Sequence, residues 1–167
     1  MSPAVSDRIE KQVVLRAPLS RVWQALTDST EFGQWFGVRF DGPFKAGEPI
    51  SGRITPTTMD AKVAEMQKPY DGVAFNITID RIEPRTVFSF RWHPFAIDPK
   101  ADYSSEPTTL VSFVLKEVPE GVQLTVTESG FDQVPLDRRA TAFTANEGGW
   151  SMQVTLIKRY VEKPVSP

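Results

Sequence analysis

The spacing of apolar residues changes once along this chain, and that change most constrains its fold. Between Val38 and Glu128, apolar residues recur at every second position in several short runs, which is typical of antiparallel strands. After Gly130 they recur every three or four residues, which predicts one long helix over residues 135–161. The predicted buried stripe of this helix comprises Ala140, Phe143, Glu147, Trp150, Val154, Ile157 and Val161. Because a sheet and a helix with one apolar face each bury those faces together, we expect an α+β domain in which a curved antiparallel sheet wraps around the long C-terminal helix.

The N-terminal residues predict one strand and two short helices. Ile9, Val13 and Leu15 alternate with polar residues, as in a strand with one buried face. Residues 18–28 begin with a proline and carry an apolar stripe of helical spacing, and residues 29–36 predict a second short helix.

The sequence shows no feature that would divide the chain into separate domains. Residues 59–72 fit either a helical turn or a long arm of a hairpin. The sequence has no repeat, low-complexity tract or linker that would divide it. We therefore expect a single domain over residues 1–167, with a core of about 8–162.

Composition excludes several classes of function. The formal net charge is −2 with acids and bases interspersed, which gives no reason to expect nucleic acid as a partner. There is no cysteine and only one histidine, so we predict no disulfide, no metal site and no other cofactor. The N-terminus lacks the apolar run of a signal peptide, and no stretch is apolar enough to span a bilayer. These features favour a cytoplasmic protein.

Large aromatic side chains gather on the predicted inner surface. Alternation places Phe88, Phe90 and Trp92 on one face of a strand, and Gly148 and Gly149 lie on the facing helix. The aromatic residues either fill a core or form the wall of a cavity. The glycines indicate either close packing of the helix, or a kink or open portal where the helix passes the cavity. The candidate ligand-binding residues are Phe75, Ile77, Phe88, Phe90, Trp92, Phe113, Phe143, Glu147 and Trp150.

Two carboxylates fall in phase with these apolar faces. Glu128 follows Leu124 and Val126 at strand spacing, and Glu147 lies on the helix stripe. A buried carboxylate must be paired or protonated. Each is therefore a candidate general acid or base, a polar anchor for a ligand, or simply an acceptor of hydrogen bonds from an indole, an arginine or a backbone amide. Beyond these two candidates, we assign no catalytic residue.

The single histidine, His93, directly follows Trp92, so strand parity turns it away from the aromatic face. A metal site formed with Asp98 and Asp102 is less favoured than an incidental position in a proline-rich loop. That loop, residues 94–107, is longer than ordinary hairpin connections, and such loops often serve as lids or binding loops.

Several motifs resemble one known family. The segment "APLSRVWQALTDSTEFGQWF" resembles the opening of START-like (SRPBCC, helix-grip) proteins and, more narrowly, the AHSA-like domain related to the activator of the heat-shock chaperone ATPase. The segments "RIEPRTVFSFRW", "LTVTESGF" and "NEGGW" follow in the order of the later family landmarks. The landmarks in the opening segment are Pro18, Val22, Trp23, Ala25, Leu26, Thr27, Asp28, Trp35 and Phe36.

This resemblance implies a helix-grip fold with an elongated apolar cavity between the sheet and the long helix. We accordingly expect the protein to bind a small hydrophobic or aromatic ligand, without established catalysis. Two alternatives stay open: a cyclase or hydrolase-like enzyme that uses a cavity carboxylate, and a module that interacts with a chaperone. The sequence also leaves a homodimer open.

Overall fold

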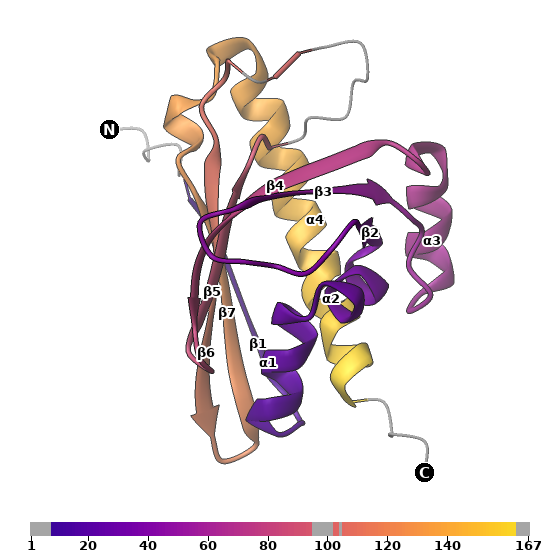
Figure 1. Cartoon of the computed structure of the whole chain (residues 1–167), viewed down its shortest axis with the longest axis vertical. Coiled ribbons are helices and arrows are strands. Elements are labelled where there is room, and N and C mark those ends of the chain that lie inside the picture. The colour runs from indigo at the N-terminus through magenta and orange to yellow at the C-terminus, as the bar shows by residue number, and fades with distance from the viewer. Residues whose placement is uncertain (1–7, 95–101, 104, 163–167) are drawn as a thin grey trace.

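The computed structural model describes residues 8–94, 102–103 and 105–162. In these residues the chain forms a strand, two helices, two strands, a short helix, four strands and a long helix (Figure 1). The strands are β1 (Arg8–Leu15), β2 (Val38–Phe40), β3 (Pro49–Ile54), β4 (Ala74–Glu83), β5 (Val87–Trp92), β6 (Thr109–Val118) and β7 (Gly121–Ser129). The helices are α1 (Leu19–Thr27), α2 (Ser29–Phe36), α3 (Ala61–Gln67) and α4 (Leu136–Glu162), with single 3-10 turns η1 (Lys68–Tyr70) and η2 (Phe131–Gln133).

All seven strands form one antiparallel sheet in the order β1-β7-β6-β5-β4-β3-β2. The pairing of β4 with β5 shifts register between Ile79 and Arg81, and such a bulge bends the sheet. Figure 1 shows β3 and β4 running at a steep angle to β5, β6 and β7, with α4 enclosed by the curve. The expected α+β helix-grip fold, with two short helices after the first strand, is confirmed.

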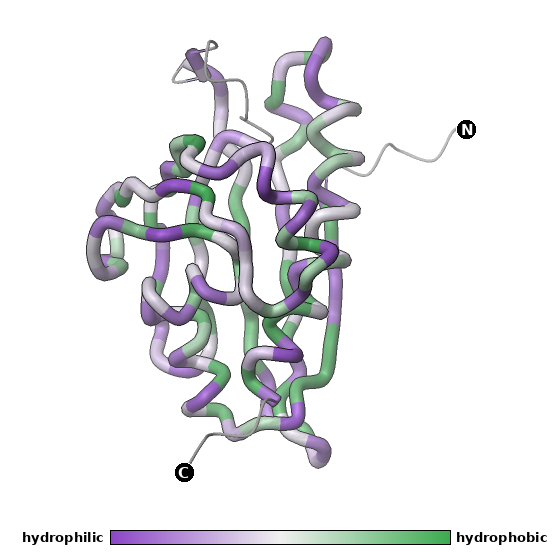
Figure 2. Tube along the Cα trace, turned by 90° about the vertical axis from the view of Figure 1, so that its right-hand side faces the viewer, coloured by the Kyte–Doolittle hydropathy of each residue, from purple (hydrophilic) through white to green (hydrophobic). Residues whose placement is uncertain are grey.

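The core lies between the concave face of the sheet and α4. Hydrophobic positions recur along the strands in alternation with hydrophilic ones (Figure 2). On α4 the buried residues are Ala142, Trp150, Leu156, Ile157 and Val161. The expected helix is therefore confirmed, but its stripe is partly wrong, because Ala140 and Glu147 are exposed. Steps of four residues back from Trp150 lead to Asn146 and Ala142, and this side of the helix faces the sheet.

The ambiguous segment between β3 and β4 is helical. Asp60 caps α3 by accepting hydrogen bonds from the backbone N–H groups of Lys62 and Val63, at 2.8 and 3.0 Å. Asp28 caps α2 in the same way, and Gly37 ends that helix with a φ of 99°, a conformation that favours glycine. Within the described residues, none of the helices combines the length and apolarity that a membrane crossing requires.

Candidate functional site

An aromatic cluster fills the space between the sheet, α2 and the middle of α4. Its rings lie with centroids 4.7–6.3 Å apart, mostly tilted or edge-on, which is the arrangement that aromatic pairs prefer. The members are Phe32, Trp35, Phe36, Phe40, Phe44, Phe75, Phe88, Phe90, Trp92, Phe113 and Trp150. The residues of α2 and the phenylalanines Phe40 and Phe44 were not among the expected site residues, although Phe32 and Phe36 have the four-residue spacing of a buried helix face.

Most of the expected site residues lie where alternation placed them. Five of the candidates are buried: Ile77, Phe88, Phe90, Phe113 and Trp150. Phe75 and Trp92 are partly buried and lie 5.5 Å apart, centroid to centroid. Phe143 is separate, because its ring packs edge-on against Phe131 of η2, 5.1 Å away. Whether these residues bind a ligand stays a prediction.

Glu128 is a buried polar residue that contacts two tryptophans of the cluster. Its carboxylate is fully buried at the end of β7. Oε2 accepts hydrogen bonds from Trp92 Nε1 at 2.7 Å and Thr109 Oγ1 at 2.5 Å, and Oε1 accepts one from Trp150 Nε1 at 2.8 Å. Asn146 Nδ2 lies 3.0 and 3.1 Å from the two oxygens. The expected alternative in which Glu128 accepts hydrogen bonds from an indole is confirmed, with two indoles rather than one.

This hydrogen bonding fixes the two tryptophans. Among the described residues, every hydrogen-bond partner of the Glu128 oxygens is a donor. The contacts hold the Trp92 and Trp150 rings 5.8 Å apart and join β5, β6, β7 and α4 at one point. The carboxylate therefore orients the aromatic wall.

The inward position expected for Glu147 is wrong. Its side chain is exposed, and the helix turns Asn146 toward Glu128 instead. Residues 146 and 147 flank the line that runs along the helix through Trp150, so the apolar spacing alone could not decide which of them the sheet would cover. Glu147 is therefore a surface residue and not a cavity carboxylate.

The glycine pair of α4 is not explained by close packing. A Cβ atom built at Gly148 or at Gly149 would meet no other atom within 4 Å, apart from its own helix backbone and chain neighbours. Gly148 is exposed and Gly149 is partly buried. The helix backbone therefore borders open space directly before Trp150.

One buried polar atom beside the cluster has no partner. Gln153 Nε2 donates to the carbonyl oxygen of Phe36 at 3.0 Å, while Gln153 Oε1 is buried and has no hydrogen-bond donor among the described residues. Gln67 Nε2 donates to the same carbonyl at 3.0 Å, but its Oε1 accepts from Thr57 N at 2.8 Å. Gln153 could not be predicted from the sequence, because its partner Phe36 is 117 residues away along the chain.

His93 belongs to the base of the β5–β6 connection. Its Nε2 lies 3.0 Å from the carbonyl oxygen of Glu106. Asp98 and most of the loop over residues 94–107 lie outside the described residues, so the lid expected there stays a prediction. In the part of the chain that the structure describes, no three His, Cys, Asp or Glu side chains are grouped as metal ligands.

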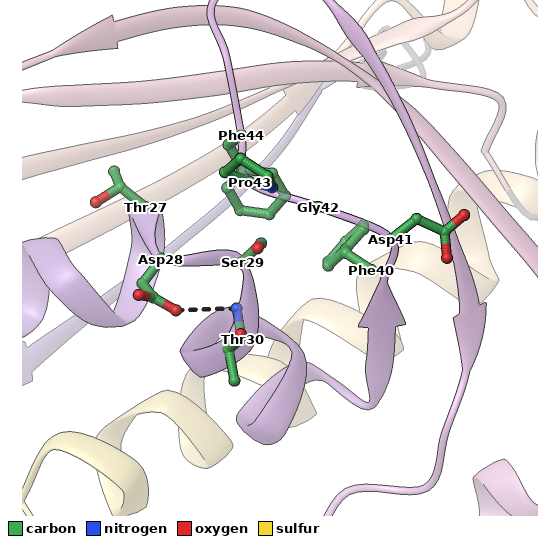
Figure 3. Close-up of a pocket in the computed structure, with 9 residues that line it drawn as sticks. All are labelled: Thr27, Asp28, Ser29, Thr30, Phe40, Asp41, Gly42, Pro43 and Phe44. Carbon is green, nitrogen blue, oxygen red and sulfur yellow. Dashed lines mark hydrogen bonds between the residues drawn. The ribbon is translucent and has the colours of Figure 1, made fainter.

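A surface hollow of about 430 Å³ lies where α1 meets α2, opposite the β2–β3 loop (Figure 3). It is lined by Thr27, Asp28, Ser29, Thr30, Phe40, Asp41, Gly42, Pro43 and Phe44. Asp28 uses its Oδ1 to cap α2, at 2.9 Å from Thr30 N and 3.0 Å from Glu31 N. The Asp28 carboxylate in this hollow therefore serves as the N-terminal cap of α2.

A curved antiparallel sheet that encloses one long C-terminal helix is the architecture of START-like helix-grip proteins. The model of the family "Activator of Hsp90 ATPase homolog 1-like protein" matches residues 16–162. The chain belongs to this family. No curated protein matches the sequence significantly.

Several solved structures share this fold. DynU16, described as a protein in the dynemicin biosynthetic locus, is 25% identical with a TM-score of 0.66; the match covers 95% of this chain and 48% of DynU16. This chain thus spans about half the length of DynU16. MLL2253 from Mesorhizobium loti is 19% identical, with a TM-score of 0.67 and 95% and 99% of the two chains covered. BPP1335 from Bordetella parapertussis is 21% identical, with a TM-score of 0.67 and coverage of 100% and 81%.

Proposed function

We propose that this protein binds a small apolar or aromatic molecule at the edge of the aromatic cluster, beside Gly149 of α4. The observation that carries the proposal is the open space at the partly buried Gly149, directly before Trp150. Trp150 packs against Trp92, which is only partly buried and in turn contacts Phe75. Ligand sites typically combine apolar walls of this kind with a few placed polar groups.

The fixed geometry of the indoles also supports a binding role. A ligand loses less free energy on binding when the wall that it contacts is already ordered. Glu128 supplies that order, because it holds both indole N–H groups at 2.7–2.8 Å. The rings therefore present their apolar faces without needing a hydrogen-bond partner from the ligand.

The enzyme alternative gains no support from Glu128. A general acid or base must lie within hydrogen-bond reach of the atom whose proton it transfers. Both oxygens of Glu128 are already engaged by side chains from β5, β6 and α4, and the residue is fully buried. The geometry of Glu128 instead suits a residue that holds neighbouring side chains in place.

The chaperone alternative is likewise not favoured by a specific surface. An interaction module typically presents a contiguous exposed apolar patch. The large exposed apolar residues among those described are dispersed: Val14 and Val114 on the sheet, Met66 and Tyr70 at α3 and η1, and Leu136 at the start of α4.

Quenching of tryptophan fluorescence by naphthalene and by myristic acid tests the proposal. We expect saturable quenching of the intact chain by at least one of the two probes. Gly149→Leu should weaken that binding by about tenfold or more, because the new side chain occupies the open space. Gly148→Leu is the matched control, since Gly148 is exposed and its substitution should leave the affinity unchanged. The proposal would be overturned if neither probe bound the intact chain, or if Gly149→Leu bound the probe with wild-type affinity.

A further inference from the structure

The polar groups of the aromatic site are almost all used within the protein. The indole N–H groups of Trp92 and Trp150 and the Asn146 amide donate to Glu128, and the Trp35 indole N–H donates to the carbonyl oxygen of Ala25. The oxygens of Glu128 also accept a hydrogen bond from Thr109. Among the described residues, the one buried side-chain polar atom without a partner is Gln153 Oε1, which can only accept a hydrogen bond.

The carboxamide of Gln153 is held in one orientation. Its Nε2 is 3.0 Å from the carbonyl oxygen of Phe36, and turning the amide over would place Oε1 against that oxygen. The orientation with Oε1 unpaired is therefore the favourable one. A buried acceptor without a donor is costly, so the site gains free energy from any molecule that brings a donor to this atom.

Gln153 also lies next to the open part of the helix. Side chains of an α-helix lean toward its N-terminus, over the turn that precedes them. Gln153 lies one turn after Gly149 on α4, and a Cβ at Gly149 would meet no side chain within 4 Å. Phe36, whose carbonyl holds the amide, has its ring 5.9 Å from that of Trp150. The unpaired acceptor and the aromatic wall thus belong to the same region.

We infer that Gln153 Oε1 is the polar anchor of the site and that it selects aromatic or alicyclic ligands carrying a hydroxyl or N–H donor. This inference rests on the proposed binding function and names its ligand class. A neutral ligand with one donor satisfies Oε1 while its apolar body contacts Trp92 and Trp150. A carboxylate ligand is disfavoured, because it brings only acceptors to a site whose own donors are already paired within the protein.

Equilibrium dialysis of the intact chain against matched naphthalene derivatives tests this inference. The probes are naphthalene, 2-naphthol, 2-methoxynaphthalene and 2-naphthoate, which share one ring system and differ in the polar group. We expect 2-naphthol to bind about tenfold more tightly than 2-methoxynaphthalene, a factor equivalent to about 1.4 kcal/mol. 2-Naphthoate should bind more weakly than 2-naphthol by at least about the same factor.

Two variants separate the anchor from the fold. Gln153→Met keeps the length of the side chain but has no strong acceptor, so the preference for 2-naphthol should fall to near unity while naphthalene binds as before. Gln67→Met is the control. It also removes one hydrogen bond to the Phe36 carbonyl, but the oxygen of Gln67 is already paired, so the preference should remain.

The outcomes are distinguishable. An undiminished preference for 2-naphthol in Gln153→Met, or tighter binding of 2-naphthoate than of 2-naphthol, would overturn the inference. If naphthalene binds the wild-type chain but the hydroxyl brings no advantage, the binding function stands and the anchor fails. If none of the probes binds, the proposed function fails and the anchor fails with it.

Discussion

At the scale of single residues, Glu128 shows how neutral side-chain donors can stabilise a buried carboxylate. Burial of an unpaired charge is costly, and here side-chain donors replace the lost water. Two of these donors are indole N–H groups, which would themselves be costly to bury unpaired. The same contacts therefore satisfy the carboxylate and both tryptophans.

Replacing this carboxylate by an amide should destabilise the protein. In Glu128→Gln, one acceptor oxygen becomes an NH2 group that faces a donor, so at least one donor among the partners is left unpaired. We expect a loss of about 2–3 kcal/mol in the free energy of unfolding, measured by urea denaturation. Glu147→Gln, an exposed neighbour of the site, should change it by less than about 0.5 kcal/mol. Equal effects of the two substitutions would contradict this account.

At the scale of elements, the glycine pair makes α4 less stable than it could be. Glycine in a helix interior costs about 0.5–1 kcal/mol relative to alanine. A Cβ at Gly148 would meet no atom within 4 Å, so Gly148→Ala introduces no clash. We expect this substitution to raise the free energy of unfolding by about 0.5–1 kcal/mol in urea denaturation. A decrease would indicate that the helix backbone is closely covered at this position.

The link between α3 and α4 should depend on pH through Asp60. The backbone N–H of Val63 lowers the pKa of this carboxyl, and the hydrogen bonds from Arg159 and Lys62 add to the effect despite partial desolvation. Because the pKa in the folded state lies below its ordinary value of 3.8, the ionised group stabilises the fold above pH 3.8. This contribution is lost as the pH falls through the lowered pKa.

Asp60→Asn isolates that contribution, because asparagine is also a good helix cap but carries no charge for Arg159. The variant should be less stable than the wild-type chain at pH 7, and the difference in urea midpoint should shrink toward pH 3. Titration of the Asp60 carboxyl carbon by NMR should give a midpoint below 3.8. A midpoint at or above that value would contradict the assignment.

At the scale of the whole molecule, local spacing predicted the fold well and the site only in part. The alternation of Phe88, Phe90 and Trp92 and the phase of Glu128 follow from the two-residue period of strands, so their inward positions could be predicted. The choice between Asn146 and Glu147 depends on a rotation of α4 against the sheet, which spacing does not determine. The orientation of the Gln153 amide depends on the carbonyl of Phe36, which only folding brings close to it.

Trp150 connects most of the molecule, and its removal should therefore have a global effect. Its ring contacts Phe36 of α2, Trp92 of β5 and Phe113 of β6, while its N–H reaches Glu128 of β7. Large truncations in a core typically cost about 3–5 kcal/mol, and we expect Trp150→Ala to lie in that range in urea denaturation followed by circular dichroism.

Trp150→Phe separates the two roles of this side chain. Phenylalanine keeps most of the apolar ring but lacks the N–H, so Glu128 Oε1 loses its 2.8 Å partner while the contacts with neighbouring rings largely remain. We expect an intermediate loss of about 1–3 kcal/mol, attributable mainly to the hydrogen bond. A loss well under 1 kcal/mol for Trp150→Ala would mean that the ring is not part of a packed core. A Trp150→Phe variant as stable as the wild-type chain would instead mean that Glu128 does not need this indole, and that the carboxylate is satisfied by its remaining partners.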